Sequence, residues 1–470
     1  MGINRRNFLV GSGLLGAGLA TMPIFGNPFV RRALADIGNR YLVVVFLDGG
    51  NDGLNTITPI DNGGGTLRQD YDAHRTTVAI DPGDLLVLGD DPLSGAALGL
   101  NPALSGFAQL HAASRLALIQ NCGYPDPNLS HEKAKQIWQT ASPLGVNTGG
   151  GWLGRGLDLH GYGSSEIPVV ATGDRIPGEF AQRSTGVLTI REIEDFGFPA
   201  DDELAGDESA RREAFASLYA SAATGGPDVL RYLGATGTAM LGATASYPPL
   251  HDAYASSRPG FLEAWNSLGG EVAPQLREIA KVIHGVNSGA PGVESRFFHA
   301  TQFGFDSHAS QGRAVAGGWH YDRMRDLGDA LALFYDDLED MGLADDVLVL
   351  VWSEFGRRVQ QNANGTDHGT AAPLFLLGGA VNGGTYGPHA NLAESALDWG
   401  GNPPYSQDPA DPFRSRDFRD VYGTILKHWV GLDEAALLAS VLPPDPAGLD
   451  PNAYWTPGTH NFDLPVLAGA

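Results

Sequence analysis

The chain has 470 residues, of which 43% are hydrophobic, and it carries a formal net charge of −24. That length is enough to bury a large core in one elaborate domain or in two, and the strong negative charge argues against nucleic acid and anionic lipid as partners. The single cysteine, Cys122, excludes a disulfide within the chain.

The first 35 residues indicate a targeting segment. Asn4–Val10, with the sequence NRRNFLV, looks like a twin-arginine export signal, and Ala33-Leu34-Ala35 fits a cleavage site. A membrane anchor is the alternative, but the segment contains glycine and proline and is only marginally long enough to span a bilayer. We therefore expect the twin-arginine translocase as a partner during export, a periplasmic or extracellular location, and no stable transmembrane segment after cleavage.

After this segment, apolar strands alternate with stretches of helix length. Leu42–Leu47 is a continuous apolar run rich in β-branched residues, which is typical of a strand buried on both faces. Further strands are predicted at Leu116–Asn121, Ile167–Ala171, Ser295–Phe303, Asp346–Trp352 and Pro373–Leu377. Helices are predicted at Pro102–Ala113, His131–Ala141, Tyr321–Met341 and Asp417–Leu432. The alternation predicts an α/β fold with a mostly parallel sheet and helices on both faces.

Residues 175–293 interrupt this alternation and are helical in character. We expect them to form a helical insertion or cap. The α/β core then consists of residues 36–174 and 294–470.

Acidic residues recur at the ends of the predicted strands. Asp48, Asp306 and Glu354 each follow a strand, so they share one edge of the sheet if these strands are parallel. Asp367-His368 comes just before the strand at Pro373–Leu377. Carboxylates gathered in one place repel each other, so either some are protonated or a cation lies among them.

Imidazoles and one hydroxyl complete the candidate site. With His308 and His368, the set is typical of zinc, manganese or iron sites. Ser130 precedes a predicted helix, where free backbone N–H groups favour an anion, and a cation would lower the pKa of its hydroxyl or of a bound water. Arg357 is suited to hold an oxyanion in bidentate fashion.

Each of these residues also has a plain structural interpretation. Ser130 fits an N-cap, and His131 a residue that packs or bonds at the helix start. Glu354 and Arg357 fit a salt bridge, and Asp367-His368-Gly369 fits a turn. Their repeated placement at strand ends favours a shared site.

The order of these residues resembles that of the alkaline phosphatase/sulfatase superfamily. More narrowly, it resembles a bacterial family of unknown function within it that is exported by the twin-arginine pathway. The resemblance is carried by NRRNFLV, VVFLDGGNDGLNT, SHEKAKQIWQTA, FDSHASQ, WSEFGRR, GTDHG and DFRDVYGTILKHWVGL.

The resemblance implies an alkaline-phosphatase-like fold, a nucleophile and one or two divalent metal ions (zinc, manganese, calcium or iron). It places Ser130 at the nucleophile position, and the expected metal ligands are Asp48, Asp306, His308, Glu354 and His368. The superfamily has Asp-His where this chain has Glu354-Phe355, so one imidazole is missing, and His131 or Asp367 are the candidates to replace it. A two-metal site, a one-metal site and a site without catalysis all remain open.

These features predict an exported metal-dependent hydrolase of phosphate or sulfate esters, with a small-molecule or polysaccharide substrate. In this prediction Ser130 attacks phosphorus or sulfur, and Arg357 or His131 steadies the transferred group. The alternative is a non-catalytic envelope or extracellular protein that uses the same fold for binding or assembly.

Overall fold

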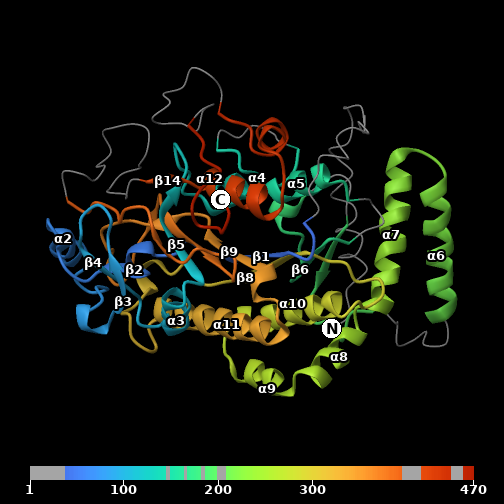
Figure 1. Ribbon diagram of the computed structural model, residues 1–470, viewed down its shortest axis with the longest axis horizontal. Helices are drawn as coiled ribbons and strands as arrows, with labels where there is room; N and C mark the ends of the chain where they lie inside the picture. Colours follow the sequence, from blue (N-terminus) through green and yellow to red (C-terminus); the bar gives the residue numbers. More distant parts are fainter. Residues whose placement is uncertain are drawn as a thin grey trace.

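A sheet of nine strands forms the centre of the molecule, with helices on both of its faces (Figure 1). The structure is a computed structural model that describes residues 37–143, 149–162, 167–181, 186–197, 208–393, 414–445 and 459–470. The predicted export signal and its cleavage site lie outside the described residues. No helix within the described ranges combines the length and the apolar character needed to cross a bilayer.

The strands of this sheet follow the order β13-β5-β12-β9-β1-β8-β6-β7, with β14 beside β5. Their bounds are β1 Tyr41–Leu47, β5 Leu116–Gly123, β6 Val169–Thr172, β7 Val187–Ile190, β8 Phe297–Gln302, β9 Val347–Ser353, β12 Ala372–Leu377, β13 Gly384–Tyr386 and β14 Arg416–Asp417. Every pairing described in this sheet is parallel except those of β12, which runs antiparallel to β5 and β9. The predicted α/β class with a mostly parallel sheet is confirmed.

The reversed direction of β12 decides where its first residues lie. The carboxyl ends of β1, β8 and β9 share one edge of the sheet because these strands are parallel. β12 runs the opposite way, so its amino-terminal end lies at that same edge. A residue that precedes β12 and residues that follow the other three strands therefore meet.

Helices cover both faces of the sheet, as the apolar runs predict. Their bounds are α2 Leu67–His74, α3 Ser105–Ala112, α4 His131–Thr140, α5 Trp152–His160, α6 Glu208–Thr224, α7 Asp228–Ser246, α8 Pro249–Ser257, α9 Pro259–Ser267, α10 Val272–Asn287, α11 Trp319–Met341, α12 Phe418–Thr424 and α13 Glu434–Ala436. The odd-numbered residues of β1 pack with α3, α10 and α11, and its even-numbered residues pack with α4, α5 and α12. Figure 1 shows these two groups of helices below and above the sheet. Burial on both faces explains why this strand is continuously apolar.

Two small sheets lie outside the main one. β2 (Ile57–Pro59), β4 (Ala97–Leu100) and β3 (Leu86–Asp90) form one of them. β10 (Gly356–Arg357) pairs antiparallel with β11 (His368–Gly369) to form the other. This second pairing joins the loop after β9 to the segment before β12.

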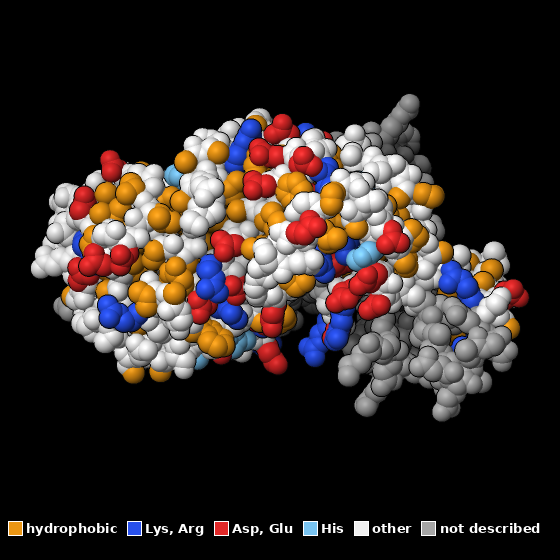
Figure 2. Space-filling view, turned by 90° about the horizontal axis from the view of Figure 1, so that it is seen from below, with side chains coloured by type: hydrophobic (Ala, Val, Ile, Leu, Met, Phe, Trp, Pro, Cys, Tyr) orange, Lys and Arg blue, Asp and Glu red, His pale blue; other side chains and the backbone are white. Residues whose placement is uncertain are grey.

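Two elements of the stretch 175–293 belong to the layered core. β7 is a parallel neighbour of β6 in the main sheet, and the apolar side of α10 packs in the same cluster as α11 and β1. α6 and α7 form a hairpin that stands at one end of the molecule (Figure 1). Figure 2 shows the face below the sheet, where acidic, basic and hydrophobic side chains are interspersed.

Candidate metal centre

Three loops meet at the carboxyl edge of the sheet, and glycine makes their approach possible. Gly49, in the turn after β1, has a φ of +125°, and a Cβ at this position would lie 2.1 Å from the backbone nitrogen of Asp306. Only glycine fits there. The Gly49 N–H donates to both carboxylate oxygens of Glu354, at 3.0 and 3.2 Å. The absence of a side chain at Gly49 therefore allows the loop that contains Asp306 to pack against the turn after β1.

Three imidazoles surround the Asp306 carboxylate. Nε2 of His308 lies 2.9 Å from Asp306 Oδ1, and Nε2 of His368 lies 3.0 Å from the same oxygen. Nε2 of His131 lies 3.3 Å from Oδ2. One ligand atom each of His131, Asp306 and His368 lie within 4.8 Å of one another, a spacing that would suit one metal ion. His308 is not part of this group, although its Nε2 contacts Asp306.

The other ring nitrogen of each imidazole is paired with an acceptor. Nδ1 of His131 lies 2.9 Å from Glu354 Oε1, and Nδ1 of His308 lies 3.0 Å from Asp367 Oδ1. Nδ1 of His368 lies 2.9 Å from the carbonyl oxygen of Leu129. These acceptors favour the tautomer that carries its hydrogen on Nδ1, so that the Nε2 lone pair is directed at Asp306. Metal-binding histidines have this arrangement in many proteins.

The charges around the site shift several pKa values. The hydrogen bond with Glu354 raises the pKa of His131, whereas burial lowers the pKa of His368. Burial by itself would raise the pKa of Asp306, but its contacts with His368 and with the Arg357 guanidinium outweigh burial and hold this pKa at about 2. Asp306 is thus a carboxylate at any physiological pH.

His308 reaches the site through an unusual backbone conformation. Its φ is +41°, in the left-handed region that few residues other than glycine adopt. Gly365 packs directly against it, since a Cβ at Gly365 would lie 1.5 Å from the His308 carbonyl oxygen. Strain of this kind, on the order of 1–3 kcal/mol, tends to occur at functional sites.

Arg357 is buried and ties the loops together. Its guanidinium donates to the carbonyl oxygens of Gly49, Gly50, Phe305 and Thr366. It also forms an ion pair with Asp306, at 3.1 Å from Oδ1. The ion pair of Arg357 is with Asp306, not with Glu354 as the structural interpretation supposed. Its predicted contact with a transferred oxyanion stays a prediction.

Asp48, predicted as a ligand, is paired with a lysine. Its carboxylate forms an ion pair with Lys135, which lies one helical turn after His131 on α4. Asp48 is not in the group of ligand atoms around Asp306 that the described residues form. The ammonium group of Lys135 offsets its charge instead.

Ser130 stands at the N-cap position of α4 and is exposed. Its hydroxyl makes no capping hydrogen bond, while its backbone N–H donates to the Asn128 side chain at 2.9 Å. The helix therefore does not occupy this hydroxyl, and its role as a nucleophile stays a prediction.

Phe355 lies where the resemblance places a histidine. Its ring packs against His131 and His368, with ring centroids 5.0 and 4.4 Å away. The imidazole of His131, at the start of α4, lies beside Asp306, and its role as the replacement stays a prediction. Asp367, the other candidate replacement, contacts His308 rather than Asp306.

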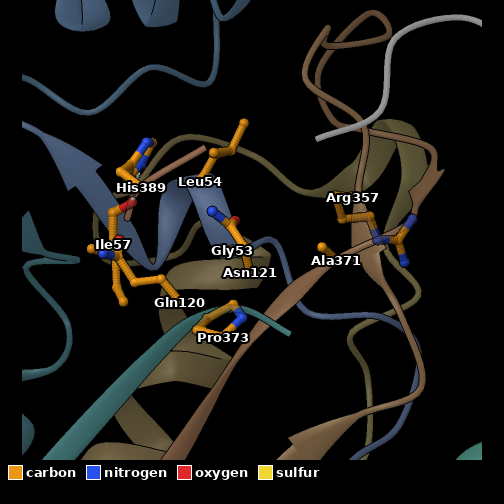
Figure 3. A pocket seen from close by; sticks show the side chains of 9 residues that line it. All are labelled: Gly53, Leu54, Ile57, Gln120, Asn121, Arg357, Ala371, Pro373 and His389. Atoms are coloured by element: carbon orange, nitrogen blue, oxygen red, sulfur yellow. Dashed lines mark hydrogen bonds between the residues drawn. The ribbon is translucent and has the colours of Figure 1, made fainter. Parts of the chain in front are cut away.

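A small pocket lies next to this cluster, and Arg357 is the one residue of the cluster that lines it. Its volume of about 20 Å³ suffices for one water molecule. Figure 3 shows Arg357 at one end of it and His389 at the other. The pocket is too small for an ester substrate. The side chains of Asp306 and His308, by contrast, are 44% and 45% exposed, so the candidate centre opens to solvent directly.

Fold and site together define an α/β protein with a candidate centre of three histidines and one aspartate at the carboxyl edge of its sheet. Residues 288–404 match a family described as "Protein of unknown function (DUF1501)". This segment contains Asp306, His308, Glu354 and His368. No curated protein matches the chain.

Several solved structures show a weak similarity to the chain. The lipoteichoic acid synthase LtaP of Listeria monocytogenes is 10% identical, with a TM-score of 0.30 over 82% of this chain and 74% of that one. An alkaline phosphatase superfamily protein of Vibrio parahaemolyticus is 11% identical, with a TM-score of 0.31 over 83% and 73%. The soluble domain of lipooligosaccharide phosphoethanolamine transferase A of Neisseria meningitidis is 9% identical, with a TM-score of 0.27 over 74% and 82%. Scores this low assign no function.

Proposed function

We propose that the protein is an exported metal-dependent hydrolase of phosphate or sulfate esters, with Ser130 as its nucleophile. The observation that carries the proposal is the convergence of three imidazole Nε2 atoms on the carboxylate of Asp306, at 2.9 to 3.3 Å. The twin-arginine motif in Asn4–Val10 supports the export part of the proposal.

The chemistry of this set requires a cation or several protons. A neutral imidazole that donates from Nδ1 turns its Nε2 lone pair toward the negative oxygen of Asp306, and the two repel unless something positive lies between them. With a divalent ion and neutral imidazoles, the charges of the ion and of Arg357 balance those of Asp306, Glu354 and Asp367. Three imidazolium rings would instead leave an excess of positive charge.

Imidazole and carboxylate ligands suit zinc, manganese or iron. In this proposal His131, His308, His368 and Asp306 hold the ion, while Glu354 and Asp367 orient two of the imidazoles. The ion pair of Asp48 with Lys135 leaves no free carboxylate on β1 for a second ion, so we favour a single-ion site.

When bound, the ion would polarise the ester and lower the pKa of a nearby hydroxyl. The chain supplies the remaining functions. The Ser130 oxygen, having lost its proton to solvent, attacks phosphorus or sulfur. The P–O or S–O bond to the alkoxide breaks, and the alkoxide takes up a proton from solvent. Water then hydrolyses the serine ester, releases phosphate or sulfate, and leaves Ser130 with its hydroxyl restored. Arg357 positions Asp306 through its ion pair.

The first test is metal analysis of the folded, purified protein. We expect about one divalent ion per chain, and turnover of an aryl phosphate or aryl sulfate that a chelator removes. Glu354→Gln should weaken metal binding by about 10- to 100-fold, because it disturbs the orientation of His131. Less than stoichiometric ion in every metal tested would contradict the proposal.

The second test separates catalysis from binding. Ser130→Ala should abolish turnover and leave the metal content unchanged, while Ser256→Ala, an exposed serine on α8, should behave as the unaltered protein. Full metal content without turnover of any aryl ester would favour the non-catalytic alternative.

A further inference from the structure

A second group of polar side chains lies on β8, apart from the candidate metal centre. His299 and Thr301 are two residues apart on this strand, so their side chains project from the same face of the sheet. Nε2 of His299 lies 3.0 Å from the hydroxyl oxygen of Thr301. Nδ1 of the same imidazole lies 2.7 Å from Oε1 of Glu179.

Burial decreases from the Glu179 carboxylate to the Thr301 hydroxyl. Glu179 is fully buried and His299 is nearly so, whereas Thr301 is partly exposed. Among the described residues, Nδ1 of His299 donates no hydrogen bond and the Glu179 carboxylate accepts none. Its ion-pair contact with His299 therefore offsets the cost of burying a charge.

The backbone around the imidazole is held from several sides. The carbonyl oxygen of His299 accepts the hydroxyl of Thr172, at the end of β6, at 2.8 Å. The ring of Phe180, next to Glu179, meets the imidazole edge-on at 6.5 Å. These contacts hold the backbone of β8 at His299 and cover one side of the ring.

Thr301 lies where β8 loses its neighbour. The pairing of β6 with β8 reaches only His299. Beyond it, the side chain of Gln275 replaces the strand, accepting from the Thr301 N–H at 2.9 Å and donating to its carbonyl oxygen at 2.7 Å. The Gln275 side chain thus holds the backbone of Thr301 in place where β6 no longer pairs with β8.

We propose that Glu179, His299 and Thr301 form a second, metal-independent catalytic group that transfers acyl groups from activated carboxylic esters. A hydroxyl bonded to an imidazole that a carboxylate orients is the recurring arrangement of activated nucleophiles. Thr301 is the nucleophile, His299 the general base, and Glu179 a positioning residue.

Thr301 Oγ1 forms a bond to the ester carbonyl carbon, and its proton passes to Nε2 of His299. The tetrahedral adduct then expels the alkoxide, which takes the proton from His299 as the carbon–oxygen bond breaks. Thr301 is left as an ester. Water, deprotonated by His299, adds to its carbonyl carbon, the bond from that carbon to Thr301 Oγ1 breaks, and the proton on His299 returns to Oγ1 as the carboxylic acid leaves.

The group shares no residue with the candidate metal centre, so the two can be tested separately. We would treat the full chain carrying Ser130→Ala with a chelator and then with p-nitrophenyl acetate. Peptide mass spectrometry should locate an acetyl group on Thr301. His299→Gln should slow this acetylation by about 100-fold or more, the usual contribution of a general base.

Conservative variants separate the chemistry from misfolding. Thr301→Ser should still be acetylated, whereas Thr301→Val should lose the adduct. Thr189→Val, a partly exposed threonine on the neighbouring strand β7, should keep it. An unmodified Thr301 in folded protein would overturn the proposal, as would equal acetylation in His299→Gln, since either result removes the activation by the imidazole.

Discussion

His320 shows how strongly the surroundings of one imidazole determine its charge. It is buried beneath the candidate centre, and its Nε2 lies 3.1 Å from Oδ1 of Asn51. Burial is the main cause that lowers its pKa from 6.5 to about 4. His131 experiences the opposite shift because Glu354 accepts its hydrogen. His320 therefore becomes protonated only at a much lower pH than His131.

The shift of His320 makes a prediction about stability. Above pH 6.5 the imidazole is neutral in both states and has no effect. As the pH falls from about 6.5 to 4, the unfolded chain binds a proton that the folded chain refuses, so stability falls with pH. The difference between 6.5 and about 4 corresponds to about 3 kcal/mol.

Urea unfolding at a series of pH values would measure this loss. His320→Gln keeps a donor for Asn51 and should reduce the slope between pH 6.5 and 4, whereas His74→Gln, at the partly exposed end of α2, should not. An unchanged slope in His320→Gln would show that other groups cause the acid sensitivity.

Most residues of the candidate site could be predicted from the sequence, but the residues that pair with them could not all be predicted. Asp306, His308 and His368 follow or precede apolar runs, and the structure brings them together. Lys135 gave no signal, because its pairing with Asp48 depends on how α4 lies over the sheet. The roles of these residues remain predictions.

At the scale of elements, the direction of β12 was the information that the sequence pattern lacked. An apolar run has the same composition in either direction, so the position of His368 could not be deduced from it. The connection from β9 to β12 does offer a signal. It contains no helix, and a parallel neighbour needs a long crossover, usually helical. An antiparallel β12 follows from that absence.

The turn after β1 supports a prediction about glycine. Gly49→Ala combines a positive φ of +125° with a Cβ placed 2.1 Å from the Asp306 backbone, so we expect loss of both stability and metal binding. Gly89→Ala, with a φ of +146° and nothing within 4 Å of its Cβ, has only the conformational cost of about 1–3 kcal/mol.

Urea unfolding and metal analysis of both glycine variants would check this. The essential comparison is that Gly49→Ala loses the ion and Gly89→Ala retains it. If both variants bind metal equally, the approach of the two loops is not what builds the centre.

At the scale of the whole molecule, the layered core was predictable and the limits of the insertion were less so. β1 and β9 are long and consist almost entirely of apolar residues, so they stand out in the sequence. β7 has only four residues, too few to show a pattern. The amphipathic α10 looks the same in sequence whether it covers the sheet or lies in an added cap.

The arrangement of layers predicts uneven local stability. All residues of β1 and β9 are buried between two layers of helices, whereas most described side chains of α6 are exposed. Amide hydrogen exchange should therefore be slowest in β1 and β9 and much faster in α6, which can open without disrupting the sheet. Peptide-resolved mass spectrometry would measure it. Equal protection of α6 and β1 would mean that the hairpin has a packing partner in solution.

The four proposed ligands come from separate parts of the chain: α4, the segment after β8, and β11 beside the reversed strand. An unfolded chain therefore has no preformed place for an ion, and binding must follow the docking of β12. If the protein binds an ion only once β12 has docked, the metal it carries would depend on which ions are present in the compartment where β12 docks. Chemical affinity alone would not decide it.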